Sequence, residues 1–302
     1  MWSIERDARL RSTALEWLAF RTNDGQDALS YREIEEFSFD DEPFRLMDPQ
    51  RGIRKPAQLA SALSIRTVWR AEGAEKPYDD AFGADGLIRY KWRGDDATHP
   101  ENRALREAMR TQQPLIWFWG VGPALYQAIF PVFLIGEEPT QHQFVVATDG
   151  LQHLRPTESP LEETLRRYVR TESLRRLHQP VFRSMVMRAY RESCAVCSLR
   201  HSVLLDAAHI VEDRHELGVA AVRNGLALCK IHHAAYDAGI LGVRPDLVVE
   251  IRRDILAEID GPMLEHGLKG NHGSRLRVVP SSPRERPDTD LLERRYERFR
   301  AG

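Results

Sequence analysis

Three cysteines and one histidine stand at the spacing of a metal site. They form two pairs, Cys194-x-x-Cys197 and, further along the chain, Cys229-x-x-His232. Two ligands separated by two residues can turn back on one ion from a tight loop, and two such pairs complete a tetrahedral zinc site. A redox pair is the alternative for Cys194 and Cys197, but it leaves Cys229 and its neighbouring histidines without a role. The spacing therefore predicts one structural Zn²⁺ site.

The sequence around these pairs predicts the elements that hold them. Residues 204–211, LLDAAHIV, are apolar and strand-like, and residues 226–229, LALC, form a second apolar run after a polar loop. The alanine-rich residues 232–238 favour a helix. On that helix His233 and Asp237, four residues apart, would share one face. The predicted order is strand, loop, strand, helix.

This segment resembles the HNH endonucleases, whose ββα-metal fold carries a histidine on its first strand, an asparagine before or on the second, and a histidine that opens the helix. On that resemblance His209, in the sequence AAHI, matches the general base. Asn224 matches the middle position and His233 the metal-binding histidine. His232 would then belong to the zinc knuckle.

The same resemblance implies a catalytic ion. In the family the base often follows directly on a metal-binding histidine or aspartate, and here that position is Ala208. Asp206 and Asp237 are therefore the candidates for that first ligand, and the ion is expected to be held by His233 with one or two of Asp206, Asn224 and Asp237. Phosphodiester hydrolysis needs a base to activate water and a cation to neutralise the leaving oxygen. We expect His209 to be that base and Mg²⁺, Mn²⁺ or a similar divalent ion to be the cation.

The composition is that of an ordinary soluble protein. The 302 residues leave room for two domains, each with its own core, and the chain is 42% hydrophobic and 29% charged. Because the predicted zinc site uses all the cysteines, no disulfide framework is available, which suits a reducing cytoplasm. The N-terminal sequence MWSIERDARLR is too charged for a secretory signal. These features predict a cytoplasmic protein.

One uncharged segment, residues 114–136, is long enough to suggest a membrane span. However, Gly120, Gly122, Pro123 and Pro131 divide it into short apolar runs, which favours buried strands joined by turns. We therefore expect two core strands and no association with a membrane.

Residues 1–155 are predicted to form a small α+β domain with a curved or barrel-like sheet. Residues 87–92, LIRYKW, alternate as a strand does, residues 99–111 are typical of a short helix, and residues 143–149 indicate a further strand. An amphipathic helix is expected near the N-terminus, with its apolar face formed by Leu10, Leu15, Trp17, Leu18 and Phe20.

Three stretches of this domain carry a second resemblance. They are PYDDAFGADGLIRYKWRGDD (77–96), NRALREAMRTQQPLIWFWGV (102–121) and ALYQAIFPVFLI (124–135). Together they resemble the SRA domain, a PUA-like fold that reads 5-methylcytosine in DNA. The resemblance implies a flipped base held in a pocket of the N-terminal domain.

The residues that match this pocket are Tyr78, Asp80 and Tyr90. A base taken out of the stack is held between aromatic faces and read by polar groups such as a carboxylate. The chain departs from the family after the strand tyrosine, where a threonine and a glycine are replaced by Lys91 and Trp92. The alternative is that Tyr78 lies in a surface turn and Tyr90 is an ordinary strand residue.

Residues 156–192 are predicted to form an arginine-rich helical linker. The net charge of the chain is −2, so an electrostatic contact with DNA has to be local. From Thr164 to His201 there are nine arginines against Glu172 and Glu192, and we predict that Arg183, Arg188 and Arg191 contact phosphates. The alternative is a solvated helix in a chain that uses arginine in place of lysine throughout.

The predicted fold class is α+β in three parts: an SRA-like reader of modified DNA (1–155), the helical linker (156–192) and an HNH nuclease domain with a C-terminal extension (193–302). The predicted function is a modification-dependent restriction endonuclease that binds modified double-stranded DNA, with 5-methylcytosine as the first candidate. Cutting both strands with one site per chain would need a homodimer, whereas a monomer could nick. One alternative is a nuclease that reads phosphorothioate, another modified base or unmodified sequence. Another is a non-catalytic zinc-containing DNA-binding protein.

Overall fold

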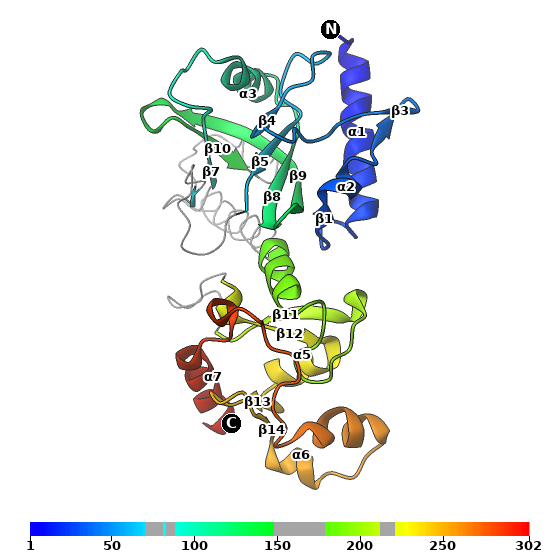
Figure 1. Cartoon of the computed structure of the whole chain (residues 1–302), viewed down its shortest axis with the longest axis vertical. Helices are drawn as coiled ribbons and strands as arrows, with labels where there is room; N and C mark the ends of the chain where they lie inside the picture. Colours follow the sequence, from blue (N-terminus) through cyan, green and yellow to red (C-terminus); the bar gives the residue numbers. More distant parts are fainter. Residues whose placement is uncertain (70–80, 83–87, 148–178, 212–220, 302) are drawn as a thin grey trace, which may run out of the picture. The chain divides into compact units, whose positions relative to one another are not determined.

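The computed structural model describes residues 1–69, 81–82, 88–147, 179–211 and 221–301. The chain divides into two compact units, Met1–Val181 and Phe182–Gly302 (Figure 1). The expected boundary between residues 155 and 156 lies outside the described residues. Each unit is considered by itself below.

The first unit is built on a curled sheet that forms a half-barrel (Figure 1). In its described part the strand order is β4-β5-β8-β9-β10-β7-β6, with β1 paired to β9. The pairing of β5 with β8 is parallel and the other pairings are antiparallel. The strands are β1 (Leu29–Ser30), β4 (Ile53–Arg54), β5 (Ser64–Thr67), β6 (Ala81–Phe82), β7 (Ile88–Lys91), β8 (Leu115–Gly122), β9 (Leu125–Glu138) and β10 (Gln143–Ala147). The predicted α+β class with a curved sheet is confirmed.

The uncharged segment 114–136 forms β8 and most of β9, so the prediction of two core strands is confirmed. Side chains alternate across a strand, and those of β8 enter two different cores. Leu115 and Trp117 pack on one face of the sheet, whereas Ile116 and Phe118 pack on the other. Burial on both faces explains why the segment carries no charge. No helix among the described residues is long and apolar enough to cross a membrane.

Helices cover the two faces of this sheet (Figure 1). On α1 (Ile4–Arg21) the buried residues Leu10, Ala14 and Leu18 recur every four positions and pack against one face. The expectation that Phe20 belongs to this apolar face is wrong: its side chain is 86% exposed because it lies off the buried stripe. The remaining elements of this unit are α2 (Tyr31–Ile34), β2 (Ser38–Phe39), β3 (Glu42–Pro43), the expected helix α3 (Pro100–Arg110) on the opposite face, and a 3₁₀ turn (Pro139–Gln141).

The second unit contains the predicted strand, loop, strand and helix, and this order is confirmed. They are β11 (Leu205–His209), β12 (Gly225–Cys229) and α5 (Lys230–Asp237), followed by the hairpin β13 (Leu241–Val243) and β14 (Val249–Ile251), and then by α6 (Arg253–Ala257) and α7 (Thr289–Ala301). Short 3₁₀ turns cover Ser202–Leu204, Val222–Asn224, Lys269–Asn271 and Pro283–Glu285. Residues Met263–Leu268 form a π-helix.

The described end of the predicted linker belongs to the core of the second unit. Residues 179–189 are helical, and Phe182, Val186 and Tyr190 pack with the apolar residues of the ββα segment. The hydroxyl of Tyr190 donates to the carbonyl oxygen of Gly225 over 3.1 Å. This helix therefore packs against the hairpin of β11 and β12 as well as preceding it.

Candidate functional site

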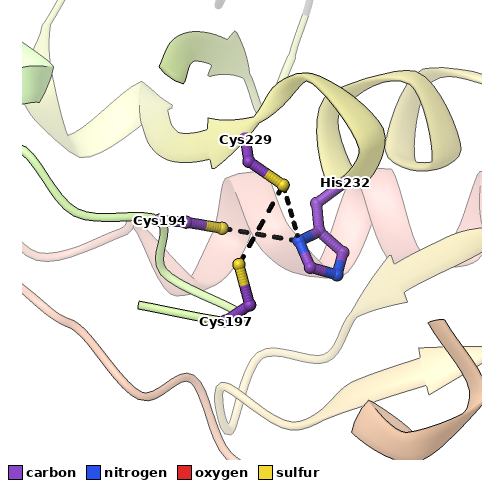
Figure 2. A group of neighbouring side chains, drawn as sticks. All are labelled: Cys194, Cys197, Cys229 and His232. Atoms are coloured by element: carbon purple, nitrogen blue, oxygen red, sulfur yellow. Dashed lines mark hydrogen bonds between the residues drawn. The ribbon is translucent and has the colours of Figure 1, made fainter. Parts of the chain in front are cut away.

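The structure brings the four predicted zinc ligands together (Figure 2). Cys194 and Cys197 come from the loop before β11, Cys229 ends β12, and His232 lies in α5. Their ligand atoms all lie within 4.8 Å of one another. The Nδ1 atom of His232 is 3.1 Å from the sulfur of Cys229 and 3.5 Å from that of Cys194. This Cys₃His cluster fits zinc binding.

A backbone carbonyl sets the orientation of His232. The Nε2 atom of His232 lies 2.8 Å from the carbonyl oxygen of Gly267, in the π-helix. Asn271 donates to the same oxygen over 2.9 Å. A proton on Nε2 leaves the Nδ1 lone pair directed at the sulfurs, which is the usual outer-shell arrangement of a zinc-binding histidine. The sequence contains no spacing signal that points to Gly267.

Hydrogen bonds within this cluster shift the pKa values of Cys197, Cys229 and His232. Hydrogen bonds from the thiols of Cys194 and Cys197 hold the pKa of Cys229 far below its ordinary value. Burial lowers the pKa of His232, but its hydrogen bonds with Cys194 and Cys229 outweigh burial and raise that pKa to about 10. Hydrogen bonds with Cys194 and Cys229 raise the pKa of Cys197, so the side chains of the cluster share protons, and a divalent cation bound by all four ligands would replace those protons.

A second group of polar side chains surrounds His233 of α5. Its Nδ1 atom is 3.3 Å from Oδ2 of Asp206, on β11, and its Nε2 atom is 3.2 Å from Oδ2 of Asp237. The prediction that His233 and Asp237 share a helix face is thus confirmed. The hydrogen bond that His233 donates to Asp206 raises the pKa of His233, although burial opposes this. Burial raises the pKa of Asp206, but the bond to His233 outweighs it and keeps that pKa below its ordinary value.

Two arginines contact the outer oxygens of these carboxylates. Arg183 lies 4.0 Å from Oδ1 of Asp206 and donates to backbone carbonyls at residues 202 and 205. Arg295, on α7, lies 3.9 Å from Oδ1 of Asp237 and donates to the carbonyl oxygen of Tyr236 over 2.8 Å. Each carboxylate therefore has His233 at one oxygen and an arginine at the other. Nothing in the spacing of α7 marks Arg295 for this place.

The donors of this group suit a hard divalent ion. Asp206 and Asp237 offer carboxylate oxygens, and their side chains are 46% and 62% exposed, so solvent and a cation can reach them. Carboxylate oxygens with one imidazole nitrogen are ligands that Mg²⁺ and Mn²⁺ accept. The residues present therefore fit the predicted catalytic ion, with His233 between the two carboxylates.

His209 ends β11, the strand that also carries Asp206. It pairs with Gly225 across the ladder, and its side chain is half-buried. The imidazole stacks on Phe182, with ring centroids 3.9 Å apart and planes 10° from parallel. The predicted base is therefore held on a regular element, with one face of its ring covered.

Asn224 joins the two ends of the loop between the strands. Its side chain, 1% exposed, accepts from the backbone N–H of Val211 and donates to the carbonyl oxygen of Val211, both over 3.0 Å. The carbonyl oxygen of Asn224 accepts from Ile210 as well. Asn224 therefore has a structural role: it holds the backbone of Ile210 and Val211, the two residues that follow His209.

Replacing Asn224 with alanine should destabilise the second unit. The change leaves two buried backbone groups of Val211 without partners, at about 1–3 kcal/mol for each unsatisfied group. We expect a lower midpoint of urea unfolding, followed by circular dichroism. Asn224→Asp places a buried carboxylate oxygen against the carbonyl oxygen of Val211, so at neutral pH its midpoint should also lie below that of the wild type. A midpoint unchanged in Asn224→Ala would contradict the role of this side chain.

The residues predicted for a base pocket are only partly described. Tyr78 and Asp80 lie outside the described residues. Tyr90 is 5% exposed, its hydroxyl donates to the carbonyl oxygen of Gly52 over 2.8 Å, and its ring meets Trp117 edge to face. The structure thus places Tyr90 in the core of the first unit, and its assignment to a base pocket stays a prediction.

The three arginines predicted to contact phosphate differ in their surroundings. Arg183 supports Asp206, as described above, and Arg188 forms an ion pair with Glu285. Arg191 is exposed at the end of the helix. Phosphate contact stays a prediction for all three, and of these side chains Arg191 is the most accessible.

Comparison with known proteins finds one family model that matches part of the chain. A family model described as HNH endonuclease matches residues 194–244, the segment that holds the Cys₃His cluster, His209, Asn224 and the group around His233. This match supports a nuclease. A solved structure titled "Modification dependent TagI restriction endonuclease" is similar at 18% sequence identity and a TM-score of 0.30, covering 82% of this chain and 85% of that chain. No curated protein matches.

Proposed function

We propose that the protein is a metal-dependent endonuclease that hydrolyses phosphodiester bonds in double-stranded DNA. The observation that carries this proposal is that His209 lies on the same strand as Asp206, and that His233 lies between the carboxylates of Asp206 and Asp237. The family match over residues 194–244 supports the same reaction.

In the proposed reaction His209 accepts a proton from the attacking water. A neutral imidazole suits this task because its ordinary pKa lies near physiological pH. A divalent ion held by Asp206, His233 and Asp237 would neutralise charge on the phosphate and the leaving oxygen. Arg183 and Arg295 place positive charge 4.0 and 3.9 Å from the outer oxygens of Asp206 and Asp237, and the backbone N–H of Ala207 donates to the outer oxygen of Asp206 over 2.8 Å.

The Cys₃His cluster has a different part in this proposal. Four protein ligands close a tetrahedral zinc site and leave no position for water or substrate, which is typical of a structural ion. We infer that Zn²⁺ bound by Cys194, Cys197, Cys229 and His232 holds the ββα segment together. Catalysis belongs to the group around His233.

We further propose that the first unit recognises modified DNA, with 5-methylcytosine as the first candidate. The support is the resemblance to SRA domains over Tyr78, Asp80 and Tyr90, together with the curled half-barrel sheet that carries Tyr90. The alternatives are that this unit recognises another modified base, phosphorothioate or unmodified sequence. Cleavage of both strands by a homodimer belongs to this proposal too.

Plasmid cleavage tests both proposals together. The full chain is incubated with Mg²⁺ or Mn²⁺ and with matched plasmids, one unmodified and one carrying 5-methylcytosine. We expect selective fragmentation of the methylated plasmid and no cleavage when EDTA removes the ion. Equal cleavage of both plasmids would keep the nuclease and contradict the methyl reader. No cleavage of these or of other modified plasmids would contradict the nuclease and favour a non-catalytic DNA-binding protein.

A further inference from the structure

The stack of Phe182 on His209 fixes the plane of the proposed base. Their ring centroids are 3.9 Å apart and the planes differ by 10°. Aromatic pairs more often lie offset or edge to face at centroid distances of 4.5–7 Å, so this pair is unusually close and almost face to face. Phe182 is 2% exposed, so its own ring is enclosed by the core of the second unit. A flat, immobile surface therefore lies against one side of the imidazole.

The position of Phe182 depends on a glycine opposite His209. Gly225 is the cross-strand partner of His209. A Cβ atom at Gly225 would lie 2.9 Å from Cζ of Phe182 and 2.4 Å from Cγ2 of Val186, closer than side chains tolerate. The absence of a side chain at residue 225 thus lets the helix approach the strand closely enough for Phe182 to reach the imidazole.

The same helix face contains two further contacts with this strand position. Val186, one turn after Phe182, is 0% exposed and packs over Gly225. It is aliphatic, and the stack on the imidazole is formed by Phe182. Tyr190, one turn further, donates to the carbonyl oxygen of Gly225. Phe182 differs from both because its ring covers the imidazole itself.

We propose that Phe182 is a positioning residue for His209, which rests on the proposed function of His209 as the general base. A base must present its ring nitrogen to the attacking water within hydrogen-bond reach. Because Phe182 covers one face of the His209 imidazole, the imidazole cannot rotate out of the plane of the stack, even before DNA binds. Phe182 lies outside residues 194–244, the part that matches the HNH family model. The feature that orients the base therefore comes from the helix in front of the family segment.

A kinetic comparison of full-chain variants tests this proposal. Phe182→Leu keeps an apolar side chain but removes the flat surface. We expect its kcat to fall on the order of 10- to 100-fold, the scale of small misplacements in an active site, with KM for the DNA duplex unchanged. Val186→Ala is the matched control, because it removes core packing from the same helix face but leaves the ring of Phe182 in place. A kcat for Phe182→Leu no lower than that of Val186→Ala would overturn the proposal.

A spectroscopic measurement tests the stack without relying on cleavage. In the wild-type protein the ring protons of His209, assigned by their loss in His209→Gln, should be shifted upfield by the ring of Phe182. Phe182→Leu should abolish the shift and Val186→Ala should keep it. A shift that survives Phe182→Leu would overturn the proposal. If the shift behaves as expected and the wild type cleaves no DNA, the proposed function fails and the positioning of His209 stands.

A second variant covers the case in which Phe182→Leu does not fold. Phe182→Met fills the space with an unbranched, adaptable side chain that lacks a ring. It should fold, lose the upfield shift of His209 and show the same fall in kcat. A folded Phe182→Met protein with wild-type kcat would overturn the proposal as well.

Discussion

A His209→Ala variant should lose DNA cleavage by roughly 10²- to 10⁴-fold, the contribution typical of a general base. His209 is half-buried at the end of β11, on the same strand as Asp206. Its removal takes away the proton acceptor but leaves Asp206, His233 and Asp237 to hold the ion. We therefore expect DNA binding to persist. Single-turnover cleavage of a labelled duplex measures the first effect, and fluorescence anisotropy of the same duplex measures the second.

The matched control for this variant is His201→Ala. His201 is an exposed histidine of the same unit, shortly before β11, and it belongs to neither cluster. Its removal should leave cleavage at the wild-type rate. If His209→Ala cleaves as fast as His201→Ala, another group must activate the water. If His209→Ala neither binds DNA nor keeps the circular dichroism spectrum of the wild type, the residue holds the fold.

Those parts of the site that follow from local spacing could be predicted from the sequence. The two pairs of zinc ligands repeat the spacing of a closed tetrahedral site, and His233 and Asp237 follow the period of a helix. The strands around them are short apolar runs, and the helix is rich in alanine. Each of these signals lies within a few residues of chain, and the corresponding elements and contacts are present in the structure.

The supporting contacts could not be predicted because they join distant parts of the chain. Gly267 orients His232 through a backbone oxygen, which any residue type could supply. Arg295 reaches the carboxylate of Asp237 from α7, and Phe182 reaches His209 from the preceding helix. None of these residues has a partner at a characteristic spacing. Only the packing of the second unit brings them to the site.

The first unit shows a related limit on sequence reasoning. Alternation along residues 87–92 predicted the strand β7, and the pattern of burial at Ile88 and Tyr90 follows it. The alternating pattern does not show whether the face of β7 that carries Ile88 and Tyr90 packs into the core or binds a ligand. In the structure Tyr90 contacts Gly52 and Trp117 inside the unit, so its hydroxyl already has a protein partner. For Phe20 the apolar type alone suggested burial, whereas the spacing of Leu10, Ala14 and Leu18 decides the buried face.

The two clusters are linked through consecutive residues of α5. His232 belongs to the Cys₃His cluster and His233 to the group with Asp206 and Asp237. Consecutive residues of a helix point roughly 100° apart, so one helix turns one histidine to each cluster. The ladder between β11 and β12 makes a second link, because Leu205, next to Asp206, pairs with Cys229. Whatever holds the cysteines therefore also holds the group around His233.

Loss of zinc should accordingly unfold the second unit and spare the first. Structural zinc contributes about 10–16 kcal/mol in zinc-finger peptides, and a whole domain is stable by about 5–15 kcal/mol, so Cys197→Ser should leave this unit largely unfolded. Cys197 is half-buried, which keeps the packing change small. All 6 tryptophans lie between Trp2 and Trp119 in the first unit, so tryptophan emission should stay as in the wild type while far-ultraviolet circular dichroism falls. A zinc-free protein with the wild-type spectrum would show that hydrophobic packing holds the ββα segment without an ion.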